Sequence, residues 1–104
     1  MIERETIIEL VNQELKDANK KYPLFHSPHE AYGVLLEEAD EVMFEVDRID
    51  DAMADMWRRV KTDLDIEKTA DYIYAHAVNG IRELIQVAAM CEKIKQSKLY
   101  EEKE

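Results

Sequence analysis

Apolar residues recur along most of the chain with the spacing of amphipathic helices. Over residues 28–61, and again over residues 65–95, the gaps between apolar positions alternate strictly between four and three, as along a coiled-coil seam. A less regular helical stripe covers residues 2–21. The two long seams consist of Leu35, Ala39, Val42, Val46, Ile49, Met53, Met56 and Val60, and of Ile66, Ala70, Ile73, Ala77, Gly80, Leu84, Val87, Cys91 and Ile94. The pattern predicts an all-α protein with three helices, because no run alternates with the period of a strand.

Residues that favour helix ends mark the boundaries of these segments. Pro23 ends the first helix, because the residue before a proline disfavours the α conformation. The second helix begins at a capping box, in which Ser27 is the N-cap, Pro28 is the first helical residue and Glu30 is the third. Residues 62–65 include three residues of the types that favour the N-cap of a helix, so we expect a turn here. We therefore expect the second and third helices to form a long antiparallel hairpin, with the first helix packed across it.

The pair Asn79-Gly80 leaves two arrangements open for the third helix. Between strands this pair would indicate a turn, but helical patterns flank it on both sides. Gly80 falls on the apolar seam, where a missing side chain allows two helices to approach closely. The third helix is either continuous or broken here, and a break would give four helices.

The length of the seams also predicts self-association. The chain of 104 residues fits one domain over residues 1–104. One hairpin and one further helix offer too little surface to cover seams this long. We therefore predict a helical bundle that is completed by oligomerisation, as a homodimer or a homotetramer.

Composition narrows the classes of partner. The formal net charge of −10 repels a phosphate backbone, so we expect no nucleic-acid partner. The start of the chain, MIERETIIEL, has no continuous apolar segment, so we expect no signal peptide, no membrane contact and a cytoplasmic location. The single cysteine, Cys91, excludes an intramolecular disulfide, and its place on the seam predicts a small core residue.

Glutamates crowd one stretch of the second helix. Four of them lie within about two and a half turns: Glu37, Glu38, Glu41 and Glu45. If the hairpin turns near residues 63–64, this stretch faces Glu83 and Gln86 of the third helix. Each helix then directs side chains three residues apart to one face, and four oxygen-bearing groups can converge. Such a set suits Mg²⁺, whereas the alternative interpretation is an ordinary solvated acidic surface.

These residues resemble the motifs of the MazG-like, all-α nucleoside triphosphate pyrophosphohydrolases, and in particular their small phage-type members. Residues 37–41, EEADE, match the EExxE motif of that family. Residues 83–86, ELIQ, stand where the family has ExxD. The resemblance is strongest over residues 26–46 and 82–92, about a third of the chain.

The resemblance implies a helical bundle whose carboxylates bind Mg²⁺, or Mn²⁺, and through it the phosphates of a nucleotide substrate. Attack by water then releases pyrophosphate and a nucleoside monophosphate. Carried over by position, the metal ligands are Glu38, Glu41 and Glu83. Glu37 lies beside them or orients the water, which makes Glu37 and Glu41 the candidate catalytic carboxylates.

One position departs from the family pattern. Gln86 replaces the aspartate of ExxD, and its amide oxygen can ligate Mg²⁺ but supplies neither negative charge nor a base. Gln86 is thus a weaker candidate ligand. Glu45, one turn beyond Glu41, is the candidate to replace the missing carboxylate.

Other polar and aromatic residues have two interpretations each. Tyr22, Phe25 and His26 either wall a nucleobase pocket near the metal or serve loop packing and capping. His76 is expected at the surface or in a subunit interface. Lys93 could meet phosphates, but its place near a helix C-terminus favours the simpler role of complementing the helix dipole.

The motifs and the apolar seams are compatible with three functions. The first is a Mg²⁺-dependent nucleoside triphosphate pyrophosphohydrolase. The second is a non-catalytic relative that binds a metal or a nucleotide, which Gln86 favours. The third is a helical oligomeric interaction module.

Overall fold

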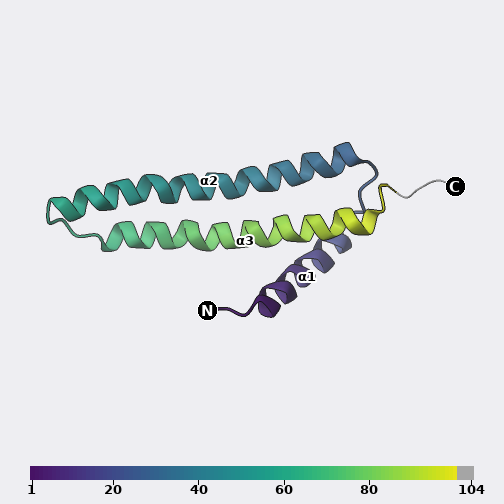
Figure 1. Cartoon of the computed structure of the whole chain (residues 1–104), viewed down its shortest axis with the longest axis horizontal. Coiled ribbons are helices and arrows are strands. Elements are labelled where there is room, and N and C mark those ends of the chain that lie inside the picture. The colour runs from purple at the N-terminus through teal and green to yellow at the C-terminus, as the bar shows by residue number, and fades with distance from the viewer. Residues whose placement is uncertain (101–104) are drawn as a thin grey trace.

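Three α-helices make up the computed structural model, which describes residues 1–100 (Figure 1). Helix α1 spans Arg4–Lys21, α2 spans Pro28–Lys61 and α3 spans Glu67–Ser97. Residues 1–100 contain no strand, so the predicted all-α class is confirmed. The bounds of α2 agree with the prediction, whereas α3 begins and ends two residues later than expected. None of the helices within this range is long and apolar enough to span a membrane.

Helices α2 and α3 lie antiparallel and form a long hairpin, and α1 crosses α3 at an angle near the open end of that hairpin (Figure 1). The molecule is therefore elongated, with extents of 69 × 27 × 22 Å. At the closed end, the N–H of Leu64 donates to the carbonyl of Arg59 (2.9 Å) and satisfies the last turn of α2. Asp63 adopts a left-handed conformation with φ 57°, which aspartate tolerates better than most residues. The predicted turn is thus in place.

Side-chain caps hold the connection between α1 and α2 against the end of α3. The N–H of Glu30 donates to Ser27 Oγ (3.1 Å), as the capping box predicts. The carboxylate of Glu30 in turn accepts from the N–H of His26 (3.1 Å), one residue before the N-cap. The N–H of Phe25 donates to Ser97 Oγ (3.0 Å). The connection is therefore tied to α3 as well as to α2.

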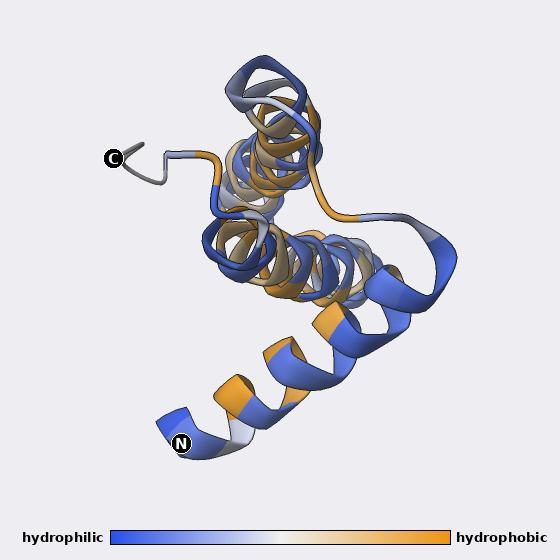
Figure 2. Ribbon diagram, turned by 90° about the vertical axis from the view of Figure 1, so that its right-hand side faces the viewer, coloured by the Kyte–Doolittle hydropathy of each residue, from blue (hydrophilic) through white to orange (hydrophobic). Residues whose placement is uncertain are grey.

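The hydrophobic core lies at the open end, where all three helices meet. Its buried residues are Val11, Leu15, Phe25, Ala31, Ala89 and Met90. Figure 2 shows α1 running outward from the hairpin with its hydrophobic residues on one side. No residue of α1 before Val11 is buried, because the start of this helix diverges from α3 (Figure 1).

The two seams are rotated away from the contact between α2 and α3. Apart from the seam residue Gly80, the residues that pair across this contact precede the seam positions by one. Thus Glu45 pairs with His76 and abuts Gly80, while Thr69 contacts Asp55. Several seam positions then face outward: Met53 and Leu84 are 51% and 54% exposed, and Val46 and Val60 are each 46% exposed.

Cys91 shows the consequence of this rotation. We expected a core residue at this seam position, but Cys91 is exposed. The buried residues around it are Ala89, Met90 and Lys93, which lie on the face of α3 that is covered by the rest of the chain. The prediction for Cys91 was therefore wrong, because it assumed that the seam faces inward along its whole length.

Helix α3 is continuous through Asn79-Gly80, so the first of the two arrangements is confirmed. Gly80 is buried against α2. A Cβ built on Gly80 would lie 3.7 Å from Cβ of Glu45, which is an ordinary van der Waals contact. The glycine thus permits a close approach of the helices but leaves room for one methyl group.

Replacing Gly80 by alanine should therefore stabilise the protein. Glycine in a helix interior costs about 0.5–1 kcal/mol relative to alanine, and the added methyl group fits. We expect Gly80→Ala to raise the free energy of unfolding by about that amount in urea denaturation. The matched control is Gly33→Ala on α2, where a Cβ would meet nothing within 4 Å. A loss of stability in Gly80→Ala beside a gain in Gly33→Ala would contradict the described packing.

Candidate metal centre

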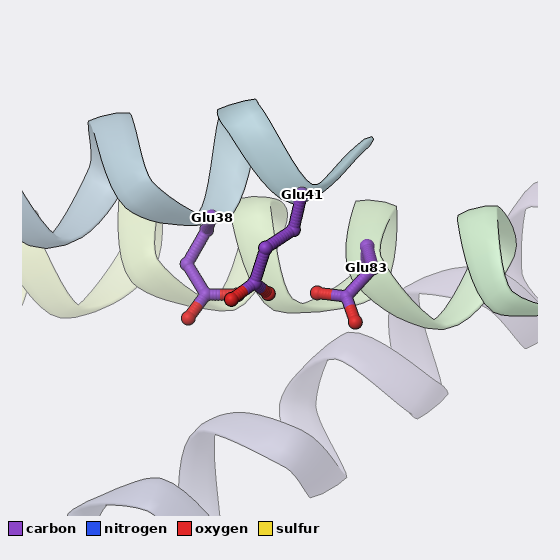
Figure 3. Close-up of side chains that lie close together, drawn as sticks. All are labelled: Glu38, Glu41 and Glu83. Atoms are coloured by element: carbon purple, nitrogen blue, oxygen red, sulfur yellow. The ribbon is translucent and has the colours of Figure 1, made fainter. Parts of the chain in front are cut away.

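Three glutamate side chains converge between the two long helices. Glu38 and Glu41 extend from adjacent turns of α2, and Glu83 extends from α3. Each offers a carboxylate oxygen, and these oxygens all lie within 4.8 Å of one another. Figure 3 shows the three carboxylates turned toward one another in the space between the helices. The structure thus brings together the three residues that the MazG-like motifs mark as ligands.

Two features of the hairpin create this convergence. The turn after Lys61 sets the register that places the acidic stretch of α2 beside Glu83. Gly80, one turn before Glu83, lets α3 approach the backbone of α2 at Glu45. Side chains as long as glutamate can then meet across the contact rather than extend into solvent.

The carboxylates are held in an electrostatically unfavourable arrangement. Glu38 Oε2 and Glu83 Oε2 are buried and have no hydrogen-bond partner within residues 1–100. Burial raises the pKa of Glu38, and the charges of Glu41 and Glu37 raise it further. A hydrogen bond with Glu41 raises the pKa of Glu83 to about 7, with burial and the charges of Glu41 and Glu38 adding to the shift. Glu83 is therefore partly protonated near neutral pH.

The donor set fits a hard divalent cation. All three groups are carboxylates, and oxygen is the ligand that Mg²⁺ and Mn²⁺ prefer. A cation would also satisfy the two buried oxygens that no protein group satisfies among the described residues. The cation would take the place of the proton on Glu83, because a cation and a proton both reduce the repulsion between the carboxylates.

Glu45 does not join the three converging glutamates. Its Oε2 lies 2.5 Å from Nδ1 of His76, and both side chains are largely buried. The ring of His76 also packs against Tyr72. His76 therefore lies in the contact between α2 and α3, not on the free surface that we expected as one option. No motif indicated this pair, and only the register of the hairpin reveals it.

A cavity of about 780 Å³ lies beside the cluster, bounded by α1, the connection after it and the open end of the hairpin. Glu37, Glu38 and Gln86 line it on the side of the cluster. The other residues that line it are Glu14, Asp17, Ala18, Lys21, Tyr22, Pro23, Phe25, His26, Glu30, Val34, Met90 and Lys93. The candidate aromatic wall of Tyr22, Phe25 and His26 and the candidate metal ligands therefore border one space. Gln86 borders this space without being part of the carboxylate cluster.

Lys93 lines this cavity and is buried, which the sequence did not lead us to expect. We expected a lysine that complements the dipole at the end of α3, but Lys93 is only 3% exposed. Its ammonium lies 5.1 Å from the centroid of the Phe25 ring. The spacing along the chain does indicate this position. Gln86, Met90 and Lys93 follow Glu83 at intervals of three, four and three, so all of them share one face of the helix.

Comparison of the chain with protein-family models, curated proteins and solved structures found no match. The likeness to the MazG-like enzymes therefore rests on the two carboxylate motifs.

The raised pKa of Glu83 predicts how metal-free stability depends on pH. The folded pKa of about 7 lies above the ordinary value of 4.5, so the folded state binds the proton more tightly than the unfolded state does. The resulting stabilisation is complete below the unfolded pKa and is lost as the pH rises through about 7. Between about pH 5 and pH 8, the free energy of unfolding of the parent protein should fall by an amount on the order of 2 kcal/mol relative to that of Glu83→Gln. This figure allows for partial solvent screening.

The measurement is urea denaturation of both proteins in a chelator at each pH. The comparison with Glu83→Gln removes the contributions of other groups. One of these groups is Asp55, whose pKa is lowered by hydrogen bonds with Arg58 and Arg59. Its contribution to the stability of the protein is lost as the pH falls. A difference between the two proteins that stays constant over this range would contradict the described cluster.

Proposed function

We propose that this protein is a Mg²⁺-dependent nucleoside triphosphate pyrophosphohydrolase. The observation that carries the proposal is the convergence of Glu38, Glu41 and Glu83 at the edge of a cavity that aromatic side chains also line. One side of the space suits a cation with phosphates, and the other suits a nucleobase. The resemblance of residues 37–41 and 83–86 to MazG-like motifs supports the same function.

Glu38, Glu41 and Glu83 would hold the cation, and Gln86 is available at the cavity wall to add an amide oxygen. A bound divalent cation offsets the charge of the phosphates, lowers the pKa of a water molecule and aligns its attack. Mn²⁺ can serve in place of Mg²⁺, because both prefer oxygen ligands.

The remaining chemistry falls to groups of the chain itself. The oxygen of a water molecule bonds to the α-phosphorus, and the bond from this phosphorus to the bridging oxygen breaks. Pyrophosphate leaves with the bridging oxygen, and a nucleoside monophosphate remains. Glu37 borders the cavity next to Glu38, where it can orient the water and accept its proton. Glu41 contributes both to the cluster and to the electrostatic field at the reacting phosphate.

A second function has one observation in its favour. Gln86 stands where the family has an aspartate, so the site has one fewer negative charge and one fewer base. A relative that binds a metal or a nucleotide without turnover would keep the glutamate cluster and tolerate this change. Stabilisation by metal without hydrolysis would select this alternative.

Self-association belongs to the same proposal. The outward seam positions Val46, Met53 and Val60 on α2, together with Leu84 on α3, leave large apolar side chains exposed along the hairpin. Their exposure favours burial against another copy of the hairpin, because apolar surface removed from water stabilises the assembly. We therefore propose a homodimer or homotetramer. Partner helices would cover the part of the hairpin that α1 leaves open (Figure 1).

The metal site is tested by thermal unfolding with and without Mg²⁺. A ligand that binds only the folded state stabilises it, so Mg²⁺ at ten times its dissociation constant should add about 1.4 kcal/mol and raise the Tm by several degrees. Glu38→Gln should abolish this shift, and Glu41→Gln should abolish metal-dependent release of pyrophosphate. The control is Glu9→Gln, which makes the same chemical change at an exposed position of α1 outside the cavity lining. An equal Mg²⁺ shift in Glu38→Gln and the parent protein would refute the site.

The assembly is tested by analytical ultracentrifugation at micromolar concentration. The parent protein should sediment as a dimer or tetramer, and Met53→Glu should weaken association by at least about tenfold, because it places a charge within an apolar contact. Phe44→Glu is the matched control. Phe44 is 52% exposed and Met53 is 51% exposed, but nine residues place them on opposite sides of α2. A monomeric parent protein, or equal effects of both substitutions, would contradict the proposed interface.

A further inference from the structure

The end of the cavity away from Glu38, Glu41 and Glu83 contains a buried lysine whose ammonium has no hydrogen-bond or ion-pair partner among the described residues. Lys93 is 3% exposed, and its ammonium makes no hydrogen bond or ion pair with any residue in the described range 1–100. Its ammonium is not among the fully buried polar atoms that lack a partner there, so it remains accessible from the cavity that Lys93 lines. A charged group in such surroundings is costly unless something pairs with it. A ligand of the cavity is the group that can do so.

Contacts around Lys93 position its backbone and the ring of Phe25 beside its ammonium. The hydroxyl of Ser97 donates to the carbonyl of Lys93 (2.7 Å) and accepts from the N–H of Phe25 (3.0 Å). The ammonium lies 5.1 Å from the centroid of the Phe25 ring, within cation–π range. Val34 and Met90 add apolar lining to the cavity. This part of the cavity thus offers the Lys93 ammonium as a donor together with aromatic and apolar surface.

The position of Lys93 along α3 indicates which part of a nucleotide it meets. Ten residues separate Lys93 from Glu83, which corresponds to about 15 Å along the helix axis. A nucleoside triphosphate that lies along the cavity with its phosphates at the glutamates therefore directs its base toward Phe25 and Lys93. An aromatic ring is a natural surface for the base to stack on.

The charge of the cavity favours a neutral acceptor at this point. Five carboxylate side chains and two lysines line the cavity, so a free anion is repelled unless a cation accompanies it. An ammonium has three N–H donors and no acceptor. The group of the base that can accept from this ammonium is a carbonyl oxygen at its distal edge. An amino group at that edge would be a second donor facing the ammonium, and no hydrogen bond could form between them.

Resting on the proposed function, we infer that Lys93 is a specificity-determining residue. It selects nucleotides with a 4-keto pyrimidine or a 6-keto purine over their 4-amino and 6-amino counterparts. The favoured bases are therefore uracil, thymine, guanine and hypoxanthine. A base whose amino group faces Lys93 would leave the ammonium unpaired, and a binding site rejects ligands strongly when they leave its buried polar groups unpaired.

The test is isothermal titration calorimetry with two matched pairs of monophosphates, UMP against CMP and IMP against AMP, each with Mg²⁺ and with a chelator. The parent protein should bind the keto member of each pair at least about tenfold more tightly. In Lys93→Met this preference should fall to within about twofold, while binding of inorganic pyrophosphate with Mg²⁺ stays unchanged. Lys93→Gln should also bind both members alike, because an amide can donate or accept. The control Lys21→Met changes the other lysine of the cavity, which is exposed, and should keep the preference.

Three results would overturn the inference. The first is equal binding of keto and amino bases by the parent protein. The second is a Lys93→Met variant that weakens pyrophosphate and all nucleotides to the same degree, since Lys93 would then be a phosphate contact. The third is an undiminished preference in both Lys93 variants. A keto preference that depends on Lys93 but is accompanied by no response to Mg²⁺ would instead support the role of Lys93 and reject the proposed hydrolase.

Discussion

The mutual repulsion of three carboxylates inside a helix–helix contact is the constraint around which this protein is organised. Glu38, Glu41 and Glu83 share a space in which two of their oxygens have no hydrogen-bond partner among residues 1–100. A surface acidic patch would relieve such repulsion by turning its side chains to water. Here Glu38 and Glu83 are half-buried and only Glu41 is exposed, so burial and the neighbouring charges raise the pKa of Glu38 and Glu83. A bound proton or cation therefore stabilises the cluster.

The same contact explains why the apolar seams do not lie where a simple coiled coil would place them. Glutamate and histidine occupy positions that face inward, and Glu45 and His76 satisfy each other there. The large apolar residues Met53 and Leu84 are turned outward in consequence. A polar contact within the hairpin and an apolar surface on its outside are thus two results of one rotation. The proposed metal site and the proposed self-association have a common structural cause.

Much of the fold follows from local sequence rules, whereas the site follows from them only in part. The capping box at Ser27 and the regular apolar spacing predict the limits of α2, because these signals act within a few residues. The spacing of Glu38, Glu41 and Glu83 and an antiparallel hairpin suffice to predict their convergence. The contact between Glu45 and His76 and the burial of Lys93 depend on how the helices rotate and on where α1 lies. Those properties arise from tertiary packing, which the period of a single helix does not determine.

We propose that the three glutamates bind a divalent cation, and that a proton takes its place when no cation is bound. Calorimetric titration of Mg²⁺ near pH 6.5, in two buffers of different ionisation enthalpy, measures the protons that each bound ion releases. Because the pKa of Glu83 is raised to about 7, we expect release of more than about half a proton per ion, and no such release in Glu83→Gln. Binding of Mg²⁺ without proton release, or an absence of binding, would contradict this proposal.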